Sequence, residues 1–85
     1  MAYTHVSTLT SKNSNTYATK ADWIAEHGNC GLTNPLVTSG DIVADGTNAV
    51  TRTLVYAERD DRQTHINARP GTLTFTATFV SEETT

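Results

Sequence analysis

The chain has 85 residues and a formal net charge of −3, which indicates one small domain, residues 1–85, without a strongly basic surface. Its six lysine and arginine residues are interleaved with acidic residues, whereas binding to a nucleic-acid backbone requires clustered cations. A single cysteine excludes an intrachain disulfide, and no apolar stretch is long enough to cross a bilayer. We therefore expect neither nucleic acid nor a membrane as a partner.

The first third of the sequence predicts a strand and a short helix. Residues 2–10 are rich in Tyr, Val and Thr and precede a polar, turn-forming cluster, which indicates a strand. The sequence does not decide which side of this strand faces the core. Residues 19–27 predict a helix in which Thr19 is the N-cap, Asp22 supports the cap and Gly28 follows the last turn. The expected core-facing stripe, with Trp23 beside it, consists of small or apolar residues at helical spacing: Ala21, Ile24, Ala25 and Gly28.

The middle of the sequence predicts a β-hairpin. Residues 36–44 and 49–57 have the composition of strands, and the Asp45-Gly46 pair between them favours a tight turn with positive φ angles. Gly40 indicates a bulge in the first of these strands. The second strand alternates, so one face carries Val50, Arg52, Leu54 and Tyr56, and the other carries Thr51, Thr53 and Val55.

The last third predicts a charged helix and a threonine-rich strand. Residues 58–67 favour a helix of about one to three turns, and the Pro70-Gly71 pair then interrupts regular structure. The strand Thr72–Val80 alternates strictly and is expected to turn Leu73, Phe75, Ala77 and Phe79 toward the core. Its other side carries Thr72, Thr74, Thr76 and Thr78. The polar segment 81–85 is expected to fray unless a partner chain holds it.

The order strand, helix, strand, strand, helix, strand is that of ferredoxin-like folds. We therefore expect an α+β domain with a four-stranded antiparallel sheet and one or two short helices on one face. A sheet with one helix is the main alternative, and a β-sandwich with a helical insert is the third. Eighteen Val, Leu, Ile, Phe, Trp and Met residues fill one core layer and leave little room for a deep cavity, so we expect marginal stability and self-association.

Candidate catalytic and metal-binding residues are few. His27 and Cys30 have a spacing that occurs among metal ligands, but a structural zinc site needs about four donors, and only His5 and His65 remain to supply the others. The sequence contains no nucleophile elbow, phosphate loop or dinucleotide-binding fingerprint. We therefore predict a non-enzymatic protein without a metal or another cofactor.

A pocket between the sheet and the helices is the alternative hypothesis. The sequence is compatible with a small dimeric ferredoxin-like enzyme or ligand-binding domain of the monooxygenase type. Its pocket would contain Arg52, His5 or Trp23 if the first and third strands are neighbours. The ordinary interpretation of these residues is a half-exposed arginine, a strand histidine and a core tryptophan. We favour the ordinary interpretation because the core residues leave little room for a pocket.

Two groups of residues are candidates for protein–protein contacts. The first is the uncharged, β-branched face formed by Thr72, Thr74, Thr76 and Thr78, which combines methyl groups for burial with hydroxyl groups for hydrogen bonds. This strand contains no Lys or Pro that would block the addition of another strand to its edge. The second is the mixed-charge run Arg59, Asp60, Asp61 and Arg62, which is suited to a charge clasp between subunits.

Four features of the sequence together carry a resemblance to a known class of proteins. They are the opening segment Met1–Thr10, the excess of Thr, Asn and Gly, the hairpin that leads into Thr51–Ala57, and the short acidic tail. In these features the chain resembles small structural proteins encoded by tailed bacteriophages. The resemblance implies a virion component made in the host cytoplasm, such as a capsid cement or decoration protein or a small tail protein. It implies a homo-oligomer whose partners are identical copies and a larger virion protein; a small phage inhibitor of a host protein is a further alternative.

Overall fold

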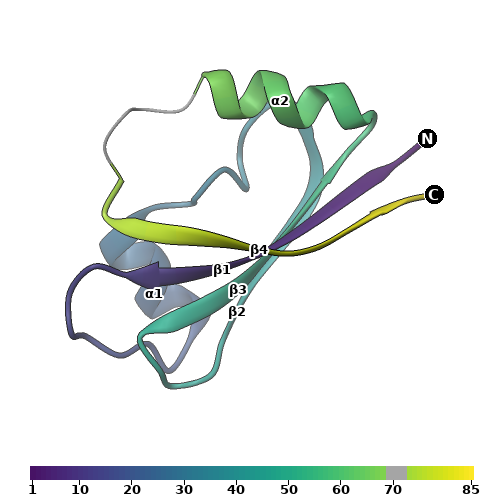
Figure 1. The fold of residues 1–85 in the computed structure, drawn as a ribbon. Helices are drawn as coiled ribbons and strands as arrows, with labels where there is room; N and C mark the ends of the chain where they lie inside the picture. Colours follow the sequence, from purple (N-terminus) through teal and green to yellow (C-terminus); the bar gives the residue numbers. More distant parts are fainter. Residues whose placement is uncertain (69–72) are drawn as a thin grey trace.

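The chain folds into strands and helices in the predicted order (Figure 1). The computed structural model describes residues 1–68 and 73–85. Its elements are β1 (Tyr3–Ser11), α1 (Lys20–His27), β2 (Val37–Ala44), β3 (Ala49–Tyr56), α2 (Arg59–Asn67) and β4 (Phe75–Thr84). The sheet has the order β2-β3-β1-β4, and every neighbouring pair is antiparallel. The predicted α+β class, with a four-stranded antiparallel sheet and a β-α-β-β-α-β layout, is confirmed.

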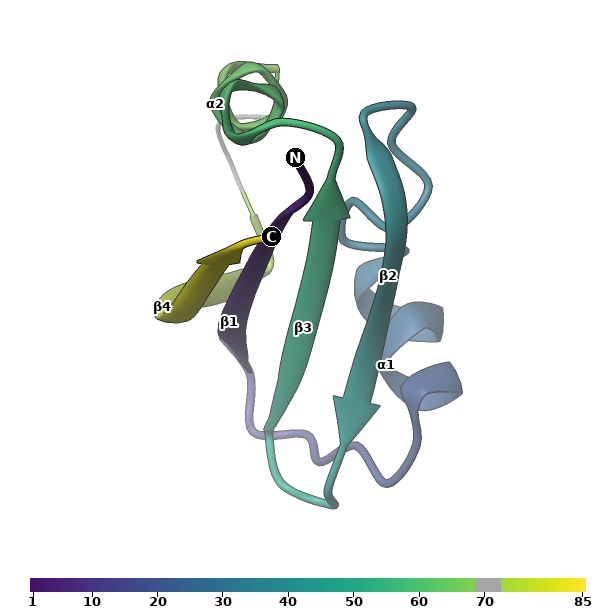
Figure 2. The same ribbon diagram turned by 90° about the vertical axis from the view of Figure 1, so that its right-hand side faces the viewer.

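The helices and the sheet form two layers. In Figure 2 the four strands stand side by side, with α1 behind them and α2 across the end of the sheet where β3 ends. Leu9, Val50 and Leu54 point to the side of the helices and are at most 3% exposed. On the opposite side, Thr51 and Thr78 are exposed, because neither helix of the described residues covers that face. We call this side the helix-free face.

The core consists of two hydrophobic clusters with an arginine between them. The larger cluster lies under α1 and contains Leu9, Tyr17, Trp23, Ile42, Val50 and Phe75. The smaller cluster contains Tyr3, Leu54 and Tyr56. Arg52 lies on β3 between Val50 and Leu54, on the same face of the sheet, and is 1% exposed. The candidate site lies at this buried arginine, where the apolar face of β3 is interrupted.

Helix α1 packs on the sheet through its indole, which corrects the predicted stripe. The hydroxyl of Thr19 accepts a hydrogen bond from the backbone N–H of Asp22 at 3.2 Å, as predicted for the N-cap. Trp23 is the buried residue of this helix and Ile24 packs beside it against the core, whereas Ala21 and Ala25 are exposed. The large indole buries more apolar area than the small residues can, so the helix turns its Trp23 side toward the sheet.

Helix α2 forms in spite of its charged sequence. The carboxylate of Asp61 accepts a hydrogen bond from the backbone N–H of Glu58 at 3.2 Å, which stabilises the first turn. The buried residues of this helix are Arg62 and His65. Polar side chains therefore anchor α2 to the sheet. This explains why the sequence of the helix has no apolar stripe.

The β2–β3 hairpin forms around the predicted Asp-Gly turn, but its irregularity lies elsewhere than expected. The register shifts between Val37 and Ser39 rather than at Gly40, which corrects the predicted position of the bulge. A Cβ atom on Gly40 would lie 2.9 Å from the carbonyl oxygen of Thr53. Glycine is therefore needed at this position for close approach to the neighbouring strand.

Strand β4 corrects the predicted strand Thr72–Val80 at both ends. It begins at Phe75 and continues through the acidic tail. Thr72 lies outside the described residues, and Thr74 precedes the strand. Residues 81–84 pair with β1 instead of fraying. The sequence did not predict this pairing because the tail lacks apolar alternation and its partner strand lies at the other end of the chain.

A bulge in β4 changes which residues of the tail face the helices. The pairing register shifts between Val6 and Ser7 of β1, and Val80 is the extra residue on β4. Phe79 and Glu82 therefore lie on the same side of the sheet, although strict alternation would have placed them on opposite sides. The bulge brings a carboxylate under α2.

Candidate functional site

A hollow between the helices and the sheet is the candidate site. It has a volume of about 280 Å³ and reaches Arg52, where the apolar core is interrupted. This corrects the expectation that the core residues leave little room for a pocket. Among the described residues, its lining consists of His27, Cys30, Gly31, Asn34, Arg52, His65, Ala68, Leu73 and Phe75.

Arg52 places a buried cation in this hollow. Its exposure of 1% shows that the predicted half-exposed arginine is wrong. Its guanidinium nitrogen Nη1 donates a hydrogen bond to the carbonyl oxygen of Cys30 at 3.0 Å. This bond ties the loop that follows α1 to the centre of the sheet. The signal in the sequence was a charged residue in the middle of the otherwise apolar face of β3.

His65, Tyr56 and Arg62 form a buried polar group at the α2 end of the hollow. The hydroxyl oxygen of Tyr56 lies 2.7 Å from Nδ1 of His65, and Nη1 of Arg62 donates to the same oxygen at 3.0 Å. Because arginine only donates, the Tyr56 hydroxyl oxygen is the acceptor in its contact with Arg62, whereas the direction of its hydrogen bond with Nδ1 of His65 depends on the tautomer of the ring. The ring is packed against the backbone of the loop: a Cβ atom on Gly31 would lie 2.6 Å from its Cε1 atom.

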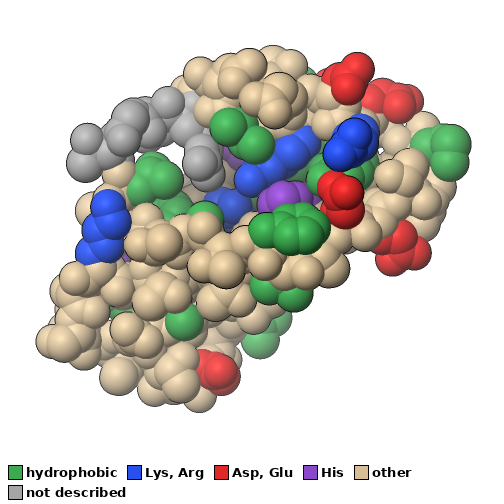
Figure 3. Space-filling view, viewed as in Figure 1, with side chains coloured by type: hydrophobic (Ala, Val, Ile, Leu, Met, Phe, Trp, Pro, Cys, Tyr) green, Lys and Arg blue, Asp and Glu red, His purple; other side chains and the backbone are tan. Residues whose placement is uncertain are grey.

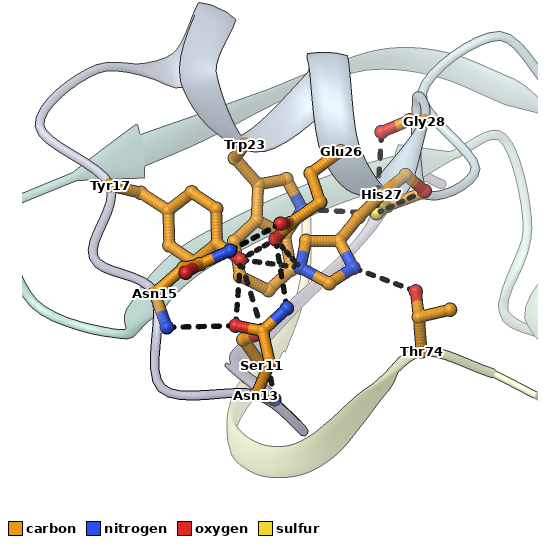
Figure 4. A network of polar contacts seen from close by, with 10 residues as sticks. Ser11, Asn13, Asn15, Tyr17, Trp23, Glu26, His27, Gly28 and Thr74 are labelled. Carbon is orange, nitrogen blue, oxygen red and sulfur yellow. Dashed lines mark hydrogen bonds and ion pairs between the residues drawn. The ribbon is translucent and has the colours of Figure 1, made fainter.

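A second polar network surrounds His27 at the α1 end of the hollow (Figure 4). The His27 side chain is 1% exposed, and its Nε2 atom lies 3.0 Å from a carboxylate oxygen of Glu26 and 2.9 Å from the hydroxyl oxygen of Tyr17. The Tyr17 hydroxyl also donates to Glu26. Nδ1 of His27 lies 2.7 Å from the hydroxyl oxygen of Thr74. Glu26, His27 and Thr74 follow one another as carboxylate, imidazole and hydroxyl, which is the order found at an activated nucleophile. Together with Tyr17, these contacts also join α1 to the loop before it and to the segment that precedes β4.

Cys30 lies between these two networks and is half-buried. Its Sγ atom accepts a hydrogen bond from Nε1 of Trp23 at 3.2 Å. Burial raises the pKa of this thiol above its ordinary value, whereas the hydrogen bond from Trp23 and the charge of Arg52 lower it; burial is the dominant cause.

We expect the Cys30 thiol to ionise at a higher pH in the folded protein than in the urea-unfolded chain. Since the folded state favours the neutral thiol, this group stabilises the fold at pH values below the unfolded pKa. The stabilisation is lost as the pH rises through the folded pKa. The pH profile of alkylation by iodoacetamide measures both midpoints. A folded midpoint at or below the unfolded one would contradict burial as the dominant cause.

A second groove, of about 440 Å³, lies between α2 and the β1–β4 edge of the sheet. Figure 3 shows basic and histidine side chains gathered in this groove beneath α2. The His5 ring packs on Phe79 with ring centroids 5.4 Å apart, and the Tyr3 hydroxyl donates to Glu82. A nitrogen of Arg59 lies 3.8 Å from the same carboxylate. Arg59 and Glu82 of this groove therefore form an ion pair that joins α2 to β4.

The predicted threonine face is part of a wider surface. Thr76 and Thr78 are exposed on the helix-free face, as expected. Thr74 is also exposed, but its hydroxyl lies beside His27 rather than on this face. Thr72 lies outside the described residues.

The mixed-charge run is divided among several roles. Arg59 and Asp60 are exposed at the start of α2. Asp61 caps that helix, and Arg62 is buried against Tyr56. Arg59 also lies 3.8 Å from Glu82 of β4, so three of these four side chains cap α2 or join it to the sheet.

The residues of the alternative pocket are separated by the fold. Arg52 lines the first hollow, His5 lines the groove under α2, and Trp23 lies in the larger core cluster. Within residues 1–68 and 73–85, no three His, Cys, Asp or Glu side chains are grouped to hold a metal ion. In the same part of the chain, no helix is long and apolar enough to span a membrane. Comparison with protein-family models, curated proteins and solved structures found no match to this chain.

Proposed function

We propose that this chain is a non-enzymatic structural protein that assembles by packing its helix-free face against the same face of a second copy. The resemblance to small phage structural proteins supports a virion as the site of assembly, with a larger virion protein as a further partner. The single observation that carries the proposal is the composition of the helix-free face, which is threonine-rich and nearly without charge at its centre.

The strand register gathers threonines from three strands into one row. Thr8 of β1 lies between Thr78 of β4 and Thr51 of β3, and Val43 of β2 continues the row beyond Thr51. Val43 is 61% exposed, which is high for a large apolar side chain within a strand. Cross-strand neighbours of this kind form a flat surface of methyl and hydroxyl groups. Such a surface can be buried at a small cost in side-chain entropy.

The size and charge of this face suit a second copy. Four strands of about eight residues give a face of about 500 Å² per copy, or about 1,000 Å² for a pair, from the usual strand spacing and rise. That area is near the lower limit for a specific interface. The carboxylates of the face, Asp41 and Glu83, lie toward the edge and end of the sheet, so the centres of two copies can meet without like-charge repulsion.

The substitution Thr51→Glu tests this proposal. We expect the parent chain to be a dimer by size-exclusion chromatography with light scattering. We expect the variant to be a folded monomer, because it places two carboxylates near one another in a desolvated interface. Thr16→Glu introduces the same charge at an exposed loop position and is expected to leave the dimer intact. A parent chain that stays monomeric at high concentration, or a dimer that survives Thr51→Glu, would overturn the proposal.

A further inference from the structure

We infer that the hydroxyl group of Thr74 is an acyl-acceptor site, which an activated ester or thioester of a small acid modifies covalently with His27 as the general base. The inference concerns the contacts of His27 with Glu26 and Thr74, which we call the Glu26–His27–Thr74 relay (Figure 4). It is independent of assembly through the helix-free face. It rests on the hydrogen-bond directions of the relay, on the fixed position of the imidazole and on the exposure of Thr74.

The carboxylate of Glu26 fixes the tautomer of the His27 ring. An ionised carboxylate only accepts hydrogen bonds, so the contact of 3.0 Å between Nε2 of His27 and Glu26 places a ring proton on Nε2. In the neutral ring, Nδ1 then carries a lone pair. At a distance of 2.7 Å, this atom accepts the hydroxyl proton of Thr74. A base in this position is the one that activates a hydroxyl group as a nucleophile.

The base and the carboxylate behind it are held in place by further contacts. The side-chain amide of Asn15 donates a hydrogen bond to Glu26 at 2.6 Å. The ring centroids of His27 and Trp23 lie 4.1 Å apart, and the His27 side chain is 1% exposed. The imidazole therefore keeps its orientation toward Thr74 before a reagent arrives, which is the condition for efficient proton transfer.

Thr74 combines a fixed backbone with an exposed side chain. Its carbonyl oxygen accepts a hydrogen bond from the backbone N–H of Lys12 at 3.1 Å, directly before β4 begins. The residue is exposed, so a small reagent reaches its hydroxyl group from solvent. Ser7 offers a comparison: its hydroxyl oxygen also lies 3.0 Å from a ring nitrogen of His5, but Ser7 is only 2% exposed. Thr74 is therefore the better acceptor.

The modification transfers one acyl group to the chain. The hydroxyl oxygen of Thr74 forms a bond to the carbonyl carbon of the donor, and its proton passes to Nδ1 of His27. The bond between this carbon and the leaving alkoxide or thiolate then breaks, and the leaving group takes the proton from His27. Glu26 stabilises the imidazolium ion that exists between the two transfers. The products are an ester at Thr74 and a free alcohol or thiol.

The probe for the test is p-nitrophenyl acetate, a small activated ester. Proteolysis and tandem mass spectrometry after short exposures measure the rate of acetylation at each threonine. We expect Thr74 to react about 100-fold faster than Thr76, which is an exposed threonine of the same segment. We also expect the rate at Thr74 to rise with the neutral fraction of His27, which nuclear magnetic resonance of its ring protons measures over the same pH range.

Variants separate the nucleophile from the residues that position it. Thr74→Val removes the hydroxyl group and is expected to remove the label, whereas Thr74→Ser keeps it. Thr76→Val is the matched control and is expected to leave the rate at Thr74 unchanged. Glu26→Gln replaces the carboxylate with a neutral amide at a side chain that is 34% exposed. It is expected to lower the rate at least tenfold while circular dichroism stays unchanged, because the imidazolium ion loses its counter-charge.

Three results would overturn the inference. They are acetylation of Thr74 no faster than that of Thr76, a rate that does not change with the neutral fraction of His27, and a folded Glu26→Gln variant that reacts as fast as the parent chain. A network that only joins segments of the chain predicts these results. Thr51→Glu lies on the helix-free face and is expected to leave the acetylation of Thr74 unchanged, so the assembly test and this test fail independently.

Discussion

Replacing Trp23 with alanine is expected to lower the free energy of unfolding by about 3–5 kcal/mol. The indole is fully buried and is the buried part of α1. Its ring centroid lies 4.9 Å from that of Tyr17 and 5.9 Å from that of Phe75, so its removal leaves a cavity inside the larger core cluster. Since domains of this size have a total stability of about 5–15 kcal/mol, the loss would leave α1 poorly docked and the fold marginal.

Urea unfolding followed by circular dichroism measures this loss, because the substitution removes the only tryptophan and its fluorescence. Trp23→Phe keeps an aromatic ring and is expected to cost less. Ala25→Ser changes an exposed position on the same helix, and we expect a change within about 0.5 kcal/mol. A Trp23→Ala variant as stable as the parent would show that α1 is not held through its indole.

Gly31→Ala is expected to destabilise the fold more than Gly46→Ala. The two glycines have positive φ angles of 93° and 88°, so alanine is strained at both. At Gly31 the new Cβ atom would also lie 2.6 Å from Cε1 of His65, whereas nothing lies within 4 Å of it at Gly46. We therefore expect Gly31→Ala to cost about 1–3 kcal/mol more, which is the usual cost of overpacking.

Chemical denaturation of both variants measures the difference in their free energies of unfolding. A double-mutant cycle with His65 tests whether the contact with that ring causes the difference. Because His65→Ala removes the ring that collides with the new Cβ atom, Gly31→Ala is expected to cost less in that background. Nuclear magnetic resonance of the Tyr56 and His65 rings would report whether their hydrogen bond is broken in the Gly31→Ala variant. Equal losses at the two glycines would mean that the loop moves away from His65 without cost.

The local sequence signals predicted most of the fold because each acts over a few neighbouring residues. The Asp45-Gly46 turn, the Thr19 cap and the alternation of β3 are all present in the structure. The buried side of α1 was predicted only in part: Ile24 packs against the core, whereas Ala21 and Ala25 are exposed, because a short helix with several small residues has no strong apolar period. One large indole then decides its orientation through packing.

The candidate site was only partly accessible from the sequence. The alternation of β3 placed Arg52 on the apolar face, but a charged residue there is equally compatible with a side chain that reaches solvent. The Tyr56–His65 hydrogen bond had no sequence signal, since the polar residues of α2 were indistinguishable from a solvated face. The pairing of Glu82 under α2 depended on the bulge at Val80, which strict alternation does not predict.

The amino-acid sequence by itself determined the α+β class, the order of the elements and the side of β3 on which Arg52 lies. Those features depend on backbone preferences and side-chain periodicity within short segments. Only the tertiary structure decided that Arg52, Cys30 and His65 line one hollow, and that threonines of three strands form one face. These residues are distant in the sequence, and strand register and helix packing, which are cooperative properties of the whole chain, bring them together.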